Sequence, residues 1–152
     1  MTRDFSVIKF RSAVPASDVA DLRNRLRQAR WPDPLENEGW QDGASLSFMR
    51  KLVDYWLNDF DWHAEESRLN RMPQFMASVD GQDIHFLHHR GIGPDPFPII
   101  MTHGWPGSFL EMERIVPLLT NPAAHGGDPA ETFDVIVPSL PGFGFSPGPA
   151  AP

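Results

Sequence analysis

The sequence contains no cysteine, which excludes disulfide bonds and thiolate metal sites. No apolar run approaches the length of a membrane span, and the first residues lack the apolar core of a signal peptide. Basic clusters are absent too, and a net charge of −7 argues against nucleic-acid binding. With 152 residues, 41% of them apolar, the chain can still bury a core. We therefore expect a cytoplasmic globular protein with no membrane and no nucleic-acid partner.

One short motif, His103-Gly-Trp-Pro-Gly-Ser108, lies between a predicted strand and a predicted helix. The strand is Pro98–Thr102, whose short, continuous apolar run is typical of a strand buried on both faces. The apolar residues of the helix recur at i, i+3, i+4 and i+7, namely Met112, Ile115, Val116 and Leu119. Ser108 and Glu111 have the spacing of a capping box. A tight turn that opens a helix presents backbone N–H groups, which can bind negative charge.

The first half of the chain is predicted to be mostly helical. A short extended segment at Phe5–Arg11 precedes a helix that Ser17 can cap and that runs to about Arg30. The strongest helical pattern begins at Ser45, and Asp61 can cap a further short helix. The apolar stripe of these helices carries tryptophans. We interpret this stripe as core.

Strands dominate the second half of the chain. Two alternating runs flank Asp80-Gly81, which is a strong hairpin signal because both positions can adopt positive φ. The runs consist of Phe75, Ala77 and Val79, followed by Ile84, Phe86 and His88. Phe133–Val137 is the last predicted strand and leads into the segment Pro138–Ser146. The fold class expected from this order is α/β.

Three of these segments resemble a known family. The His-Gly-x-Pro sequence after a strand resembles the oxyanion-hole loop of α/β-hydrolases, and its tryptophan variant is most similar to epoxide hydrolases of the microsomal type. The loop Pro141-Gly-Phe-Gly-Phe-Ser146 and the tryptophan-bearing first third match the same family. The resemblance covers residues 5–147. It implies an amino-terminal helical meander over residues 1–74 and, over residues 75–152, the first four strands and first helix of a truncated α/β-hydrolase sheet.

The resemblance also implies a site. The Trp105 backbone amide would be one of two donors to a developing oxyanion, and its indole would line the substrate cavity. His103 would brace the loop and would not act as the catalytic base. The residues expected to support the two loops are His103, Gly104, Pro106, Gly142 and Ser146. The implied reaction converts a small-molecule epoxide and water into a vicinal diol, and it needs no metal or organic cofactor.

Two further patterns mimic other sites. His85, His88 and His89 suggest a metal site, but His88 would point to the opposite face of a strand, so we do not expect ligation. Gly126-Gly-Asp-Pro-Ala130 mimics a nucleophile elbow, but it lies in a loop that leads into a strand. The residue after Asp128 is a proline, which has no N–H to donate to an oxyanion. Asp128 is therefore predicted to be a turn residue.

The family's other catalytic groups have no counterpart in this sequence. There, the nucleophilic aspartate, the cap tyrosines, the acidic residue and the histidine all follow the second loop, and the sequence given ends at Pro152. We therefore expect the amino-terminal part of an epoxide hydrolase that is inactive alone. Its unpaired strand edge predicts self-association or a complementing carboxyl-terminal fragment. The alternatives are a fragment of another α/β-hydrolase, such as a haloalkane dehalogenase, and a non-catalytic interaction module or gene remnant.

Overall fold

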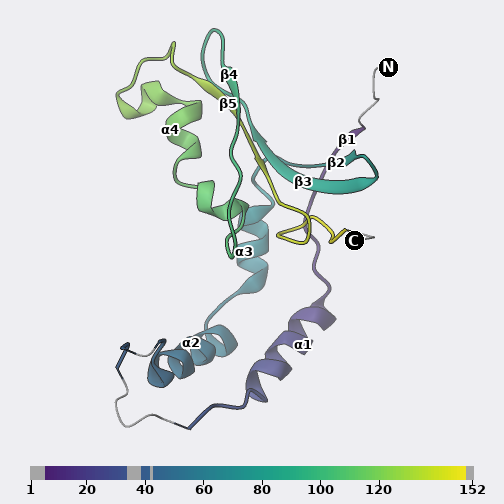
Figure 1. Ribbon diagram of the computed structural model, residues 1–152, viewed down its shortest axis with the longest axis vertical. Coiled ribbons are helices and arrows are strands. Elements are labelled where there is room, and N and C mark those ends of the chain that lie inside the picture. Colours follow the sequence, from purple (N-terminus) through teal and green to yellow (C-terminus); the bar gives the residue numbers. More distant parts are fainter. Residues whose placement is uncertain (1–5, 34–38, 42, 150–152) are drawn as a thin grey trace. The chain divides into compact units, whose positions relative to one another are not determined.

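The computed structural model describes residues 6–33, 39–41 and 43–149, shown as coloured ribbon in Figure 1. The chain divides into two compact units, one made of Met1–Arg11 and Asn70–Pro152 and the other of Ser12–Leu69. This division differs from the expected boundary after residue 74, because the extended segment near the amino terminus joins the sheet. Within the described ranges, no helix is long and apolar enough to cross a membrane. The cytoplasmic location stays a prediction.

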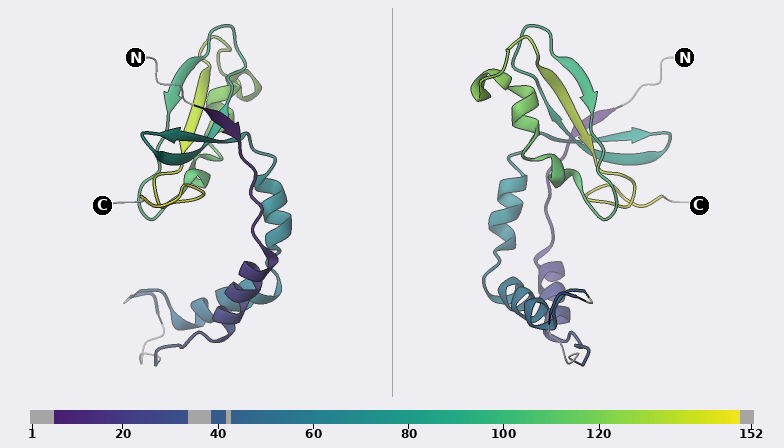
Figure 2. Two further views of the ribbon diagram at one scale, coloured as in Figure 1. Left: turned by 90° about the vertical axis from the view of Figure 1, so that its right-hand side faces the viewer. Right: turned by 60° about the vertical axis from the view of Figure 1, so that its left-hand side comes forward.

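The strands of the described ranges form one five-stranded sheet in the order β1-β2-β3-β5-β4. Their bounds are β1 Val7–Lys9, β2 Gln74–Val79, β3 Gln82–His89, β4 Phe97–Ile100 and β5 Phe133–Pro138. All neighbours are antiparallel except β4 and β5, which are parallel. Figure 2 shows β1, drawn in purple, beside β2. The expected four strands are therefore joined by a fifth, whose three residues are too few to show a strand pattern in the sequence.

The hairpin between β2 and β3 forms as predicted. Asp80 has φ 52° and Gly81 has φ 84°, so both turn residues adopt the left-handed conformation that a two-residue hairpin needs. Val79 pairs with Gln82 across the turn. The register then brings Phe75 opposite Phe86.

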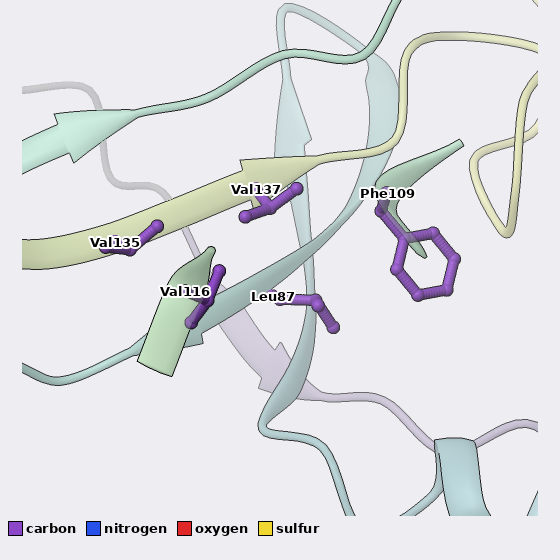
Figure 3. Close-up of a cluster of buried hydrophobic side chains, with 5 residues drawn as sticks. All are labelled: Leu87, Phe109, Val116, Val135 and Val137. Carbon is purple, nitrogen blue, oxygen red and sulfur yellow. The ribbon is translucent and has the colours of Figure 1, made fainter. Parts of the chain in front are cut away.

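The core lies between the sheet and the segment that connects β4 to β5. Figure 3 shows its five buried side chains, which are Leu87, Val135 and Val137 from the sheet, Phe109 from η1 (Phe109–Met112) and Val116 from α4 (Val116–Thr120). The connecting segment is not the single helix expected, because it divides into η1 (Phe109–Met112) and α4 (Val116–Thr120). Pro117 explains the break, since it has no N–H to donate to a preceding turn.

The buried face of β3 is not the face that the apolar alternation marks. Ile84, Phe86 and His88 are only half-buried, whereas His85 and Leu87 are buried. The reason is that η1 and α4 cover the face that carries Leu87 and its neighbour Val137. The apolar alternation therefore could not predict that His85 is buried, because it counts apolar residues alone.

The expectation that the strand after Pro98 is buried on both faces is wrong. In the structure β4 is the edge strand, and Phe97 and Ile100 are 68% and 65% exposed. Within the described ranges β4 has a neighbour on one side only. Its apolar sequence is typical of an interior strand, but β4 lacks the second neighbouring strand that would bury it.

The second unit consists of three helices, α1 (Ala16–Arg27), α2 (Leu46–Asn58) and α3 (Trp62–Leu69). Ser17 does not cap α1, because the helix already begins after Pro15. Ser45 caps α2 by accepting from Phe48 N at 3.2 Å, and Asp61 caps α3 by accepting from Ala64 N at 3.1 Å. The cap at Asp61 was predicted, and the helical pattern was predicted to begin at Ser45.

The apolar stripe of α2 is not core, contrary to our interpretation. No residue of α1 or α2 is buried. The stripe instead lines an apolar groove of about 530 Å³ together with residues of α1. The groove-lining residues of α2 are Leu52, Tyr55 and Trp56. Three short helices provide too little surface to enclose these large side chains.

Replacing Leu87 by alanine should lower the free energy of unfolding of the sheet unit by about 2–5 kcal/mol, because the cavity would be enclosed by sheet, η1 and α4. Leu118→Ala on α4 is the matched control, since Leu118 is 48% exposed. We expect a loss below about 1 kcal/mol for the control. Urea unfolding followed by circular dichroism measures both. Equal losses for the two variants would contradict the assigned core.

Candidate functional site

Two loops leave the sheet at neighbouring positions. Met101–Ser108 follows β4, and Ser139–Pro147 follows β5. The two strands are parallel, and Met101 N donates to Ile136 O at 2.9 Å. Both loops therefore begin side by side, at the carboxyl ends of the two strands. Ligands of open α/β sheets bind outside the carboxyl ends of parallel strands. The candidate site is therefore formed by these two loops.

The first loop contains a tight turn with Trp105 and Pro106 at its centre. Gly107 N donates to Gly104 O at 2.7 Å and closes the turn. The Trp105–Pro106 peptide bond is cis. A Cβ on Gly107 would overlap the carboxylate of Glu111, so a larger residue here would require the Glu111 side chain to move. Ser108 Oγ accepts from Leu110 N at 3.3 Å and so caps the turn that follows, whereas the predicted capping box would use the N–H of Glu111, which donates to the Ser108 carbonyl oxygen instead.

Trp105 presents two groups at the surface of this loop. The residue is 84% exposed, which makes Trp105 the most exposed large hydrophobic residue of the described ranges. Its backbone N–H forms no hydrogen bond within the described part of the chain. This N–H is therefore available to an acceptor that arrives from outside.

His103 joins the two loops. It is buried, and its Nε2 accepts a hydrogen bond from Leu140 N at 3.2 Å. Because an accepting ring nitrogen carries no hydrogen, the hydrogen is on Nδ1, which lies 3.2 Å from Gly104 O and donates to it. The His103 ring also packs on Phe143 of the second loop, with 5.3 Å between ring centroids. Both ring nitrogens are thus engaged in holding the loops together.

The second loop is closed by its own backbone and pinned to β3. Gly142 has φ 83° and donates its N–H to Pro147 O at 3.1 Å. Ser146 Oγ accepts from His85 N and donates to Ser139 O, both at 2.8 Å. Gly144 has φ 53°, and a Cβ there would come within 2.6 Å of Ser139 Oγ. Of the residues expected to support the loops, His103, Gly104, Gly142 and Ser146 make contacts of this kind, and Pro106 lies at the centre of the first turn. Their role in an active site stays a prediction.

A buried histidine lies beneath the second loop, and the sequence pattern did not predict it. The side chain of His85 is completely buried, with Nδ1 2.8 Å from Ser139 Oγ and Nε2 3.0 Å from Gln74 Oε1. A carbonyl oxygen can only accept, so Nε2 carries the hydrogen and Ser139 donates to Nδ1. The sequence signal that could have indicated this pair is a polar residue, Gln74, at the start of one strand and a histidine on the strand that pairs with it.

Burial lowers the pKa of His85 from 6.5 to about 4. The ring packs against Phe10, Phe109 and Phe145, with centroid distances of 5.0, 5.0 and 5.2 Å. The imidazole is therefore neutral at neutral pH, in agreement with its two hydrogen bonds. Its pairing with Ser139 resembles a serine nucleophile and its base, but Ser139 is also fully buried and cannot meet a substrate.

The other two histidines of β3 are His88 and His89. Within the described ranges, no group of three or more potential ligands gathers around a metal position. His88 Nε2 lies 3.5 Å from Asp134 Oδ2. The pKa of Asp134 lies below its ordinary value because Gly91 N donates to Oδ1 at 2.7 Å and Arg90 donates to Oδ2 at 2.6 Å. Burial, followed by the neighbouring His88, lowers the pKa of His89.

Asp128 is a turn residue, as predicted. Its Oδ1 accepts from Ala130 N at 2.8 Å, and its carbonyl accepts from Glu131 N at 3.0 Å. The turn precedes β5 and follows η2 (Pro122–His125). Asp128 therefore has neither the preceding strand nor the following helix of a nucleophile elbow.

The two loops contain donors but no reactive carboxylate or free base. Neither Met101–Ser108 nor Ser139–Pro147 includes Asp, Glu, Lys or Cys. Their only histidine is His103, both of whose ring nitrogens are occupied. The arrangement can stabilise negative charge on a bound group, but its residues supply no nucleophile.

The parallel pair, its crossover segment and the two loops at the carboxyl ends of its strands define an α/β-hydrolase fold. A family model for this fold matches residues 97–152. The chain belongs to the epoxide hydrolase family, because the model described as "Epoxide hydrolase N terminus" matches residues 7–112.

Several named proteins are similar to the chain. A protein of Stigmatella aurantiaca (strain DW4/3-1) with a provisional epoxide hydrolase name is 47% identical, over 94% of this chain and 32% of its own length. Epoxide hydrolase 1 of Oryctolagus cuniculus is 40% identical, with the same two coverages. The crystal structure of juvenile hormone epoxide hydrolase from Bombyx mori aligns with a TM-score of 0.86 at 29% identity, over 98% of this chain and 35% of that one. The chain thus spans about a third of the length of the curated relatives it matches.

The low pKa of His85 predicts a loss of stability in mild acid. In the unfolded chain the imidazole takes a proton near pH 6.5, whereas in the folded chain it does so only near pH 4. The unfolded state therefore binds more protons in this range, and stability should fall as the pH falls from about 6.5 towards 4. Urea midpoints measured across this range should fall less steeply for His85→Phe than for the wild type. Parallel pH profiles would contradict a neutral, buried His85.

Proposed function

We propose that this chain forms the amino-terminal third of an epoxide hydrolase and contributes one oxyanion donor to its active site. The substrate would be a small-molecule epoxide and the product a vicinal diol. A carboxylate from the remaining part of the enzyme attacks a ring carbon, the ring C–O bond breaks, and the oxygen takes a proton from an acid. The resulting ester is then hydrolysed by water.

The observation that supports this role is the unpaired Trp105 N–H at the carboxyl end of β4. Ester hydrolysis passes through a tetrahedral intermediate with a negatively charged oxygen, and a fixed backbone N–H stabilises that charge. His103 and the closed turn hold the Gly104–Trp105 peptide in place. The exposed indole would form part of the cavity wall once the rest of the enzyme covers it.

The same residues argue that the chain has no turnover by itself. The two loops carry no group that can attack a ring carbon, and Asp128 is occupied in a turn. The similar proteins of Stigmatella aurantiaca and Oryctolagus cuniculus carry epoxide hydrolase names, which favours this family over a haloalkane dehalogenase or a non-catalytic module.

A chimaera tests the proposed donor. This chain would replace the matching third of Epoxide hydrolase 1 of Oryctolagus cuniculus, and diol formation from a styrene-oxide-type substrate would be followed by quenched flow. Trp105→Pro removes the N–H and should slow ester hydrolysis by about 100- to 1,000-fold while ester formation changes less. The covalent ester should therefore accumulate.

Trp105→Ala is the matched control, because it removes the indole and keeps the N–H. It should retain ester hydrolysis within about tenfold of the parent rate, since the oxyanion donor remains. Slow ester formation with normal hydrolysis in Trp105→Pro would contradict the assigned role. So would an equal loss of ester hydrolysis in both variants.

The edge of β4 is proposed as the place where the rest of the enzyme adds its next strand. Phe97 N donates to Thr132 O, just before β5, and Met101 N donates to Ile136 O of β5, so by alternation the backbone groups of Pro98 and Ile100 face the open side. Proline has no N–H, so Ile100 supplies the only donor there, beside the two carbonyl oxygens. A parallel strand from a carboxyl-terminal polypeptide fits this edge. Without it, the exposed strand is a template for another copy of the chain.

Light scattering at micromolar concentration should therefore show self-association of the isolated chain. Ile100→Lys should reduce it, because a charge on an edge strand opposes strand addition. Ile92→Lys is the matched control, since Ile92 is 63% exposed but lies outside the strand. A monodisperse wild-type chain, or equal effects of the two lysines, would show that the edge is closed in some other way.

A further inference from the structure

We propose that His85 is a positioning residue for the candidate oxyanion donor, acting through Ser139 and His103 on the peptide that carries the Trp105 N–H. The proposal deepens the proposed function and rests on it for the meaning of the donor. The contacts themselves can be tested without any substrate.

The first part of this connection is the neutral imidazole. Nε2–H donates to Gln74 Oε1 at 3.0 Å, and Nδ1 accepts from Ser139 Oγ at 2.8 Å. Gln74 on β2 therefore selects the hydrogen position, and the ring orients the first side chain of the second loop. The side chains that contact the ring are Gln74, Ser139, Phe10, Phe109 and Phe145. None of them carries a charge.

The backbone of His85 holds both ends of the second loop. Its carbonyl accepts from Ser139 N at 2.8 Å, and its N–H donates to Ser146 Oγ at 2.8 Å. Ser146 Oγ in turn donates to Ser139 O at 2.8 Å. One residue of β3 thus contacts the first and the last serine of the loop, and these contacts are buried.

The second part of the connection leads to the first loop. Leu140 directly follows Ser139, and its N–H donates to His103 Nε2 at 3.2 Å. That bond leaves the hydrogen on Nδ1, which donates to Gly104 O at 3.2 Å. Gly104 O and the Trp105 N–H belong to the same planar peptide group, so fixing the oxygen also fixes the direction of the N–H. Phe109, which packs on the His85 ring, anchors the other end of this loop.

A pair of substitutions separates hydrogen bonding from packing. His85→Phe keeps a ring among the three phenylalanines but removes both hydrogen bonds, leaving Ser139 Oγ and Gln74 Oε1 without the imidazole. His85→Asn loses the ring, but its side-chain oxygen occupies the position of Nδ1 and can still accept from Ser139. A positioning role predicts that the asparagine variant preserves the loop better than the phenylalanine variant. A role in packing alone predicts the opposite order.

Hydrogen exchange measured by mass spectrometry on the full 152-residue chain provides the readout. In His85→Phe, exchange of the amides in Ser139–Ser146 should rise by about tenfold or more, because buried hydrogen-bonding groups lose their partner. The turn end of the hairpin, Ser78–Asp83, should keep its wild-type exchange. His85→Asn should restore most of the protection of the loop.

Two further variants serve as controls. Ser139→Ala removes the loop partner and leaves the histidine in place, so it should loosen the same amides even if His85→Phe folds poorly. His89→Phe, on the same strand but outside this network, should leave the loop unchanged. The proposal is overturned if His85→Phe protects the loop as well as the wild type, or if exchange rises uniformly along the sheet.

The chimaera distinguishes failure of the positioning role from failure of the proposed function. There His85→Phe should lower kcat by about tenfold or more and lower KM with it, so that kcat/KM changes little, because a misdirected donor slows ester hydrolysis and not the ester formation that precedes it. Turnover that is unaffected by His85→Phe would overturn the positioning role and leave the proposed function standing. A parent chimaera without turnover, together with the expected exchange pattern, would refute the proposed function and keep the role of His85 in ordering the loops.

Discussion

The parallel pairing of β4 with β5 is the constraint on which the candidate site depends. Because the strands run in the same direction, their carboxyl ends meet, and the two loops that follow them lie close enough for Leu140 to donate to His103. The crossover segment that parallel pairing requires also supplies Phe109 and Val116 to the core. The same pairing therefore creates both the buried centre of the sheet unit and the surface at which charge can be stabilised.

Polar groups buried beside that core give the loops a defined geometry. A purely apolar core packs through non-directional contacts, whereas His85 and His103 hold their partners through hydrogen bonds of fixed direction. Both imidazoles use both ring nitrogens. Each imidazole is occupied in orienting backbone or side-chain groups.

The open side of β4 sets the limits of what this chain can do alone. β4 has the apolar sequence of a central strand but only one neighbouring strand, so its apolar side chains and backbone hydrogen-bonding groups are exposed. The loops beside it contain a hydrogen-bond donor but no nucleophile. The exposed Trp105 and the groove of the helical unit are further apolar surfaces without cover in the described ranges. These features have one common explanation if the chain works as part of a larger α/β-hydrolase.

Local patterns in the sequence were enough to predict the hairpin at Asp80-Gly81, the cap at Asp61 and the turn at Asp128. Each of these depends on residues close together in the chain, where backbone preference and short-range hydrogen bonds decide the outcome. The sequence could not show that β1 joins the sheet or that the stripe of α2 remains exposed. Nor could it single out His85, since its partners Gln74, Ser139 and Phe109 are distant in sequence. Only tertiary pairing decides which strands are neighbours, and with them which polar side chains are buried together.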